Sequence, residues 1–174
     1  MEESIQKALR SSKINLNVRL YRMYDEGRSA GFELSDPSSD EKLFTMDIDV
    51  NRPIVETRIY EIEEIRFRGS SLIPMLADKL TVVSGETVFR RIKDLIDLYY
   101  AAQVYTPGWQ EILQAVKDSA RTLGSFDGLL KRADELQHAY NKFRFDGDVS
   151  KPAFEDVYQT VLDYIAEVLP ENKD

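Results

Sequence analysis

Residues 75–100 read MLADKLTVVSGETVFRRIKDLIDLYY, and this stretch sets the fold class. Its apolar side chains recur every three or four positions, as in amphipathic helices, and Gly85 divides it into two segments. With Arg90 at the origin of a helical wheel, Asp94 and Asp97 fall within about 40° of it and Lys93 within about 60°. The opposite side of the second segment is apolar and holds Phe89, Ile92, Leu95, Ile96 and Tyr99.

Downstream of this stretch the helical period continues. The pattern predicts five helices after Gly69, over residues 70–83, 86–105, 108–123, 126–143 and 153–169. Glycine and proline mark the breaks between them.

Upstream of Gly69 the apolar residues alternate with a period of two, which predicts strands. A short helix is predicted first, over residues 4–10. Strands then follow over residues 14–21, around 32–34, over 43–50 and within 57–68. In the third strand the alternation directs Phe44, Met46, Ile48 and Val50 to a core, and leaves Asp47 and Asp49 on the other face. The predicted fold class is therefore α+β, a small β-sheet followed by an α-helical bundle. The expected division is a strand-rich part over residues 1–68 and a helical domain over residues 69–174.

Bulk composition narrows the function classes. The chain has 174 residues, no cysteine and a net charge of -8, so thiol-based metal sites and a general affinity for polyanions are disfavoured. No apolar run approaches the roughly 20 residues that span a bilayer. The N-terminus has no apolar signal-peptide core. We therefore expect a cytoplasmic protein that does not enter a membrane.

Two interpretations fit the charged face of residues 90–97. Arg90–Asp94 and Lys93–Asp97 are i,i+4 pairs, which are common on solvated helices. Each such pair stabilises a helix by about 0.2–0.5 kcal/mol. Alternatively, the cations and carboxylates form part of a phosphate site.

The literal sequence favours the second interpretation. ADKL, followed by RRIKDLIDLYY, resembles the paired motifs of AbiEii-type toxins, a nucleotidyltransferase-like family of abortive infection and toxin–antitoxin systems. That family carries a lysine on one helix and an R-x-K-D-x-x-D pattern on the next. Lys79 matches the lysine, and the pattern matches Arg91, Lys93, Asp94 and Asp97. The resemblance runs from about residue 14 to residue 100 and is most specific over the last 26 residues.

The resemblance implies a transferase that uses a nucleoside triphosphate (NTP) and magnesium. Asp47, with Asp49 as the alternative, matches the carboxylate that a family strand brings to Mg²⁺. Lys79 would clamp a phosphate, and Asp94 or Asp97 would order that lysine or accept a proton from the attacking hydroxyl. Arg91 and Lys93 would contact the nucleotide. The implied acceptor is RNA or protein.

One part of the family pattern is missing from the printed sequence. Family members carry a Gly-Gly or Gly-Ser loop and a D-x-D pair upstream, whereas DID at 47–49 has no such loop before it. A fragment, a split gene and a degenerate protein each explain this. We therefore expect weak transferase activity, or none, from the chain alone.

Three functions remain open at this stage. The first is a partial nucleotidyltransferase-like toxin chain. The alternative is a non-catalytic interaction module that binds an antitoxin or a complementary N-terminal half, since a truncated sheet leaves an open edge through which a homodimer could also form. The third is a remnant that folds without a function.

Overall fold

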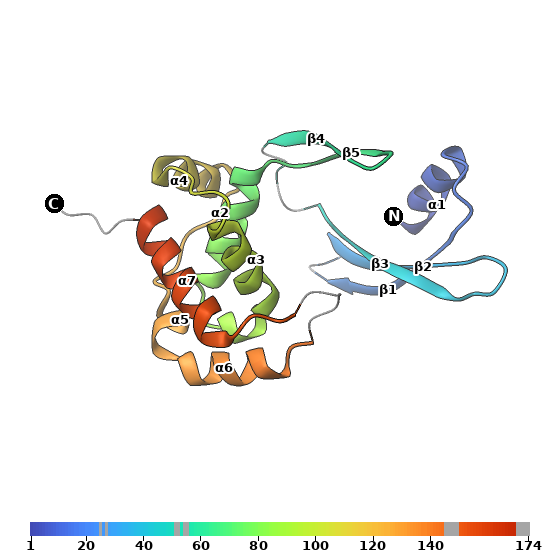
Figure 1. The fold of residues 1–174 in the computed structure, drawn as a ribbon. Coiled ribbons are helices and arrows are strands. Elements are labelled where there is room, and N and C mark those ends of the chain that lie inside the picture. The colour runs from blue at the N-terminus through green and yellow to red at the C-terminus, as the bar shows by residue number, and fades with distance from the viewer. Residues whose placement is uncertain (25, 27, 51–52, 54–55, 145–149, 170–174) are drawn as a thin grey trace. The chain divides into compact units, whose positions relative to one another are not determined.

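The computed structural model describes residues 1–24, 26, 28–50, 53, 56–144 and 150–169 (Figure 1). These residues form five strands in two antiparallel sheets, together with seven α-helices, so the predicted α+β class is confirmed. The chain divides into two compact units, Met1–Pro53 and Ile54–Asp174. Strands give way to helices between Ser70 and Leu72, as predicted, but the last strand pair packs within the second unit.

The first unit is a three-stranded antiparallel sheet with one helix. Its sheet order is β1-β2-β3, with β2 in the centre. The elements are α1 (Glu2–Ser11), β1 (Asn17–Tyr24), β2 (Ser29–Ser35) and β3 (Lys42–Asp49). Phe32 of β2 is fully buried, and the partly buried Ile5 and Leu9 of α1 pack against this core.

The predicted inward face of β3 is only half correct. Met46 and Ile48 pack against the core of the first unit, whereas Phe44 and Val50 are 48% and 60% exposed. Phe44 lies opposite the buried Leu34 but belongs to the outer strand β3, whereas α1 packs along β1 at the other edge, and Val50 lies beyond the end of β3.

Helix α1 also covers one edge of the sheet. The Gln6 side chain accepts from the Val18 N–H at 3.0 Å and donates to the Leu16 carbonyl at 2.8 Å, and Glu2 accepts from the Leu20 N–H at 2.9 Å. These side chains satisfy backbone groups that an edge strand otherwise leaves open.

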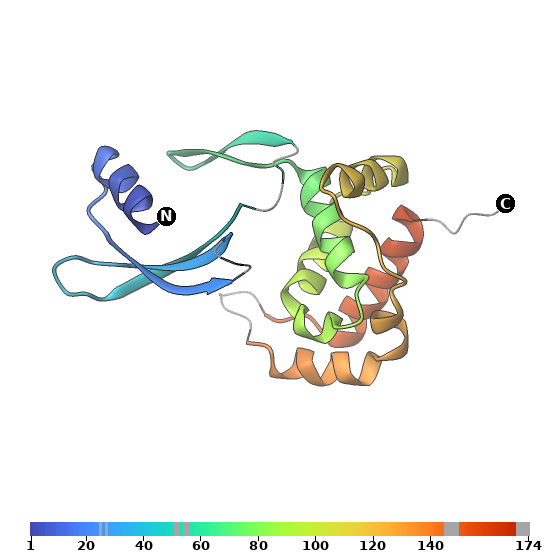
Figure 2. The same ribbon diagram turned by 180° about the vertical axis from the view of Figure 1, so that it is seen from behind.

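The second unit begins with a β-hairpin and continues as a helical bundle (Figures 1 and 2). The hairpin consists of β4 (Thr57–Ile62) and β5 (Ile65–Ser70). Helix α2 packs against α3 and α4, and α3 packs against α7. The helices are α2 (Leu72–Val83), the 3₁₀ turn η2 (Val88–Arg90), α3 (Ile92–Ala102), α4 (Trp109–Asp118), α5 (Asp127–Lys131), α6 (Ala133–Lys142) and α7 (Phe154–Val168).

The predicted final helix is confirmed. Residues 153–169 were expected to be helical, and α7 occupies Phe154–Val168. Its buried side chains follow the predicted period: Phe154, Val157, Val161, Tyr164 and Val168.

Two predicted helices are each broken in two. The prediction of one helix over 86–105 is wrong at Arg91, where φ is -124° and ψ is 36°, because residues 88–90 form a 3₁₀ turn anchored by the buried Val88. The predicted helix over 126–143 breaks at Arg132, whose guanidinium donates to the Glu86 carbonyl at 3.1 Å. Gly128 allows this close packing, since a Cβ there would lie 2.5 Å from the Gly85 carbonyl oxygen.

None of the helices in the described part of the chain combines the length and the apolar composition that a bilayer crossing requires.

Candidate functional site

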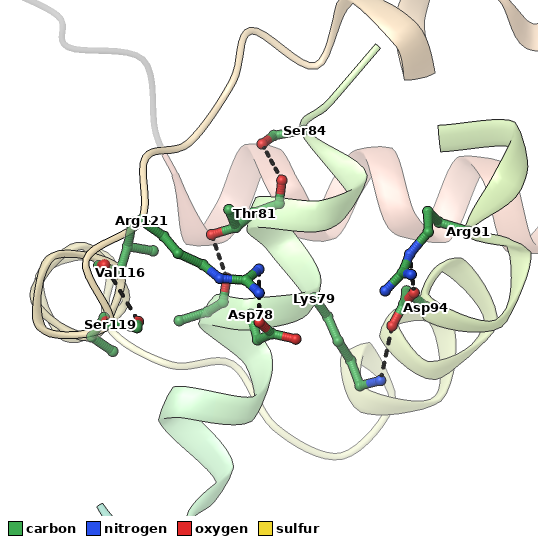
Figure 3. A network of polar contacts seen from close by, with 11 residues as sticks. Asp78, Lys79, Thr81, Ser84, Arg91, Asp94, Val116, Ser119 and Arg121 are labelled. Atoms are coloured by element: carbon green, nitrogen blue, oxygen red, sulfur yellow. Dashed lines mark hydrogen bonds and ion pairs between the residues drawn. The ribbon is translucent and has the colours of Figure 1, made fainter. Parts of the chain in front are cut away.

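Helices α2 and α3 bring three of the predicted site residues together. The Lys79 ammonium on α2 donates to the Asp94 carboxylate on α3 at 3.4 Å (Figure 3). It also makes an ion pair with Asp97, on the same helix α3. The side chains of Lys79 and Asp94 are only 20% and 15% exposed, whereas Asp97 is 35% exposed. The pairing is between two helices, so it differs from the i,i+4 pairs of a solvated helix.

Asp94 is shared between two cations. Its second oxygen accepts from Arg91 Nε at 2.9 Å, an i,i+3 contact at the start of α3 (Figure 3). Arg90 does not fill this role, because it belongs to the 3₁₀ turn that precedes the helix. Asp94 also lies in the first turn of α3, where the helix dipole favours a carboxylate.

The cluster keeps Lys79 charged. Burial lowers the pKa of Lys79, but the hydrogen bond and charge of Asp97, followed by those of Asp94, outweigh burial and hold the pKa above its ordinary value. Lys79 is therefore an ammonium at neutral pH and acts as a point charge rather than as a base.

The other side of α2 is fixed by a separate ion pair. Arg121, in the segment after α4, donates to Asp78 at 2.7 Å, and Arg121 is only 16% exposed (Figure 3). This contact ties the end of α4 to α2, one residue before Lys79, and so fixes the helix from which Lys79 projects.

A cleft of about 670 Å³ opens beside the Lys79 cluster. Its walls come from α2, η2, α3 and the end of α6. Five cations and two carboxylates line it together with apolar side chains: Lys79, Phe89, Arg90, Arg91, Ile92, Lys93, Asp94, Asp97, Ala139, Lys142 and Phe143. Arg90, Lys93 and Lys142 are exposed and make no ion pair among the residues that the structure describes.

Asp47 has different surroundings, in the first unit. Both of its oxygens accept from Arg22 Nη2 at 3.0 Å, and the Tyr24 hydroxyl lies 3.3 Å from one of them. Arg22 and Asp47 both pair in register with Gly31, where an added Cβ would lie 2.7 Å from the Tyr21 ring. The glycine thus lets the guanidinium reach across the central strand to the carboxylate.

The predicted metal residues therefore do not form a free ligand pair. Asp47 is occupied by Arg22, and Asp49 also interacts with another group. Within the described ranges, no three His, Cys, Asp or Glu side chains gather as metal ligands.

The cleft residues that were not predicted as site residues include Phe89, Phe143 and Lys142. Phe89 stacks under Arg132, whose guanidinium carbon is 4.7 Å from the ring centroid. Lys142 and Phe143 lie at the end of α6, about fifty positions after Lys93 in the sequence. No local pattern signals their approach, because it depends on how α6 packs against η2 and α3.

Comparison with protein-family models finds no match, and searches of curated proteins and of solved structures find none either.

Proposed function

We propose that the cleft binds the triphosphate of a nucleotide and that Lys79, Asp94 and Asp97 belong to a nucleotidyl-transfer site of the AbiEii type. The observation that carries this proposal is the Lys79 ammonium, held by two carboxylates on the wall of a cleft with three further cations that make no ion pair among the described residues. The chain alone is expected to bind the nucleotide with little or no turnover. A cytoplasmic location, where nucleoside triphosphates are present, belongs to the same proposal.

The charge of the cleft supports an anionic ligand. Five lining cations and two lining carboxylates give 5 − 2 = +3, whereas the whole chain carries -8. The positive cleft attracts phosphate groups, whereas the net negative charge of the chain disfavours a general affinity for polyanions. Exposed cations without partners lose no existing ion pair when a phosphate binds.

The environments of the two carboxylates suggest different roles. Asp94 is the more buried and is bonded to both Lys79 and Arg91, so it positions the lysine. Asp97 is more exposed and lies on the same cleft wall, so it is the better acceptor for the proton of an attacking hydroxyl. In this proposal Lys79 contacts a phosphate oxygen.

Magnesium is expected to accompany the nucleotide, with the phosphates as its principal ligands. Asp47 does not fit as a ready ligand, since Mg²⁺ would have to displace the two bonds from Arg22. The cations of the cleft therefore carry the proposed contacts to the phosphates.

Calorimetric titration with ATP, with and without Mg²⁺, tests the proposal. We expect Lys93→Ala combined with Lys142→Ala to weaken binding by about ten-fold or more, because two phosphate contacts are lost. Both side chains are exposed and unpaired among the described residues, so the fold should be unaffected.

Lys117→Ala is the matched control, since Lys117 is an exposed lysine on α4 outside the cleft. Equal affinity of the wild type, the double variant and the control would refute a phosphate site in this cleft. The other three NTPs, titrated in the same way, give the base preference.

A second candidate function is an interaction module that binds an antitoxin or a complementary chain. It is favoured by the hairpin of the second unit, which exposes large apolar side chains to solvent: Ile59, Ile62, Ile65 and Phe67. In the first proposal, the molecule that accepts the nucleotidyl group is RNA or a protein.

A further inference from the structure

The β4–β5 hairpin presents unpaired strand edges. Among the described residues it forms a sheet of two strands only, so each strand has one edge without a partner strand. By contrast, the outer edge of β1 in the first unit is covered by side chains of α1. An uncovered edge is a template for strand pairing with another chain.

The alternation of backbone hydrogen bonds shows which N–H and C=O groups of β5 point to the open edge. The Ser71 N–H donates to the Glu56 carbonyl at 3.1 Å, next to the Thr57–Ser70 pair. In an antiparallel ladder the bonded pairs recur every second residue, so the backbone groups of Ile65, Phe67 and Gly69 face β4. Those of Arg66 and Arg68 face the open edge.

The side chains along this edge are basic on one face and apolar on the other. Arg66 and Arg68 share one face of the hairpin, and Ile65 and Phe67 share the opposite face, with 66% and 43% exposure. Neither arginine makes an ion pair within the described part of the chain. Glu63 and Glu64 lie in the turn, and Glu61 of β4 lies opposite Arg66 on the same face, on the side of the arginine away from the open edge.

These charges disfavour a second copy of the chain that pairs through the same β5 edge. Two copies of β5 that pair antiparallel with matching faces place Arg66 opposite Arg68, or place one of these arginines opposite itself. Like charges directly opposite each other destabilise strand pairing. A strand with carboxylates at alternate positions instead meets both arginines.

We propose that the open edge of β5 binds an extended acidic segment of a partner protein by strand addition. The partner's backbone pairs with Arg66 and Arg68, its carboxylates lie along the arginine face, and its intervening apolar residues lie beside Phe67. This surface is independent of the nucleotide proposal, because none of its residues lines the cleft.

Fluorescence anisotropy with a labelled peptide of about eight alternating glutamates and valines tests the proposal. Wild type is expected to bind this peptide and to discriminate against one with lysine in place of glutamate. Arg66→Glu combined with Arg68→Glu should weaken binding of the glutamate peptide about ten-fold or more and should create binding of the lysine peptide.

Two further measurements distinguish peptide binding at the β5 edge from peptide binding in the cleft. Lys93→Ala combined with Lys142→Ala must leave peptide affinity unchanged, and a loss there would assign the peptide to the cleft and overturn the proposal. On wild type, the peptide should slow amide hydrogen exchange at Arg66 and Arg68. Unchanged exchange at both amides during saturating binding would also overturn it.

Discussion

Asp47 in the first unit and the Asp94–Asp97 pair in the second are both held by a cation, yet their surroundings differ. Arg22 and Asp47 are 47% and 57% exposed on a sheet face, and the arginine satisfies both carboxylate oxygens. Lys79 and Asp94 are 20% and 15% exposed, beside a cleft that also holds Arg90, Lys93 and Lys142. A cation and a carboxylate thus form a closed surface pair in one unit, whereas in the other they form part of the wall of a cleft.

The difference between the two regions is tested first by replacing each cation with methionine, which removes the charge and keeps an aliphatic side chain. Lys79→Met should lower the free energy of unfolding by about 2 kcal/mol, because it leaves two partly buried carboxylates without the ammonium. Arg22→Met should cost much less, since solvent compensates an exposed carboxylate. Urea unfolding measures both, with fluorescence of Trp109, the only tryptophan, reporting on the second unit.

Far-UV circular dichroism in the same titration reports on the secondary structure of both units, so a transition that Trp109 fluorescence does not show is assigned to the first unit. Similar losses for the two variants would contradict the distinction between a surface pair and a half-buried cluster.

A smaller effect is expected from alkaline pH. The pKa of Lys79 lies above the ordinary value of 10.5, because Asp97 and Asp94 outweigh the opposing effect of burial. A group whose folded-state pKa is raised contributes its stability fully below the unfolded value and loses it as the pH rises through the folded value. The difference in Tm between wild type and Lys79→Met should therefore stay constant up to the ordinary lysine value and narrow above it.

Thermal unfolding at a series of pH values measures this difference, and the other titrating groups cancel between the two proteins. A difference that widens above the ordinary lysine value would show that Lys79 is not stabilised as a cation.

Apolar periodicity in the sequence was sufficient to predict most of the fold. Alternation marked β1 to β3 and a period of three to four marked α7, because each pattern reflects one buried face. The breaks at Arg91 and Arg132 escaped prediction, since both depend on tertiary contacts such as the bond from Arg132 to Glu86. The exposure of Phe44 depends on which strand α1 covers, because α1 packs along β1 and Phe44 lies on the opposite outer strand β3.

The candidate site was predictable in part. The helical period placed Asp94 and Asp97 on one face, the family resemblance implied that one of them orders Lys79, and the structure brings these three side chains together. The pairing of Asp47 with Arg22 requires the strand register and the open space at Gly31, which no local pattern supplies. Lys142 reaches the cleft only through the packing of α6.

Nuclear magnetic resonance of ¹⁵N-labelled protein, titrated with inorganic triphosphate, tests the central claim most directly because it compares both regions in one experiment. The account predicts amide shifts around residues 79, 89–97 and 139–143, with those of Arg22 and Asp47 unchanged. Shifts centred on Arg22 and Asp47, with the cleft amides unmoved, would contradict it.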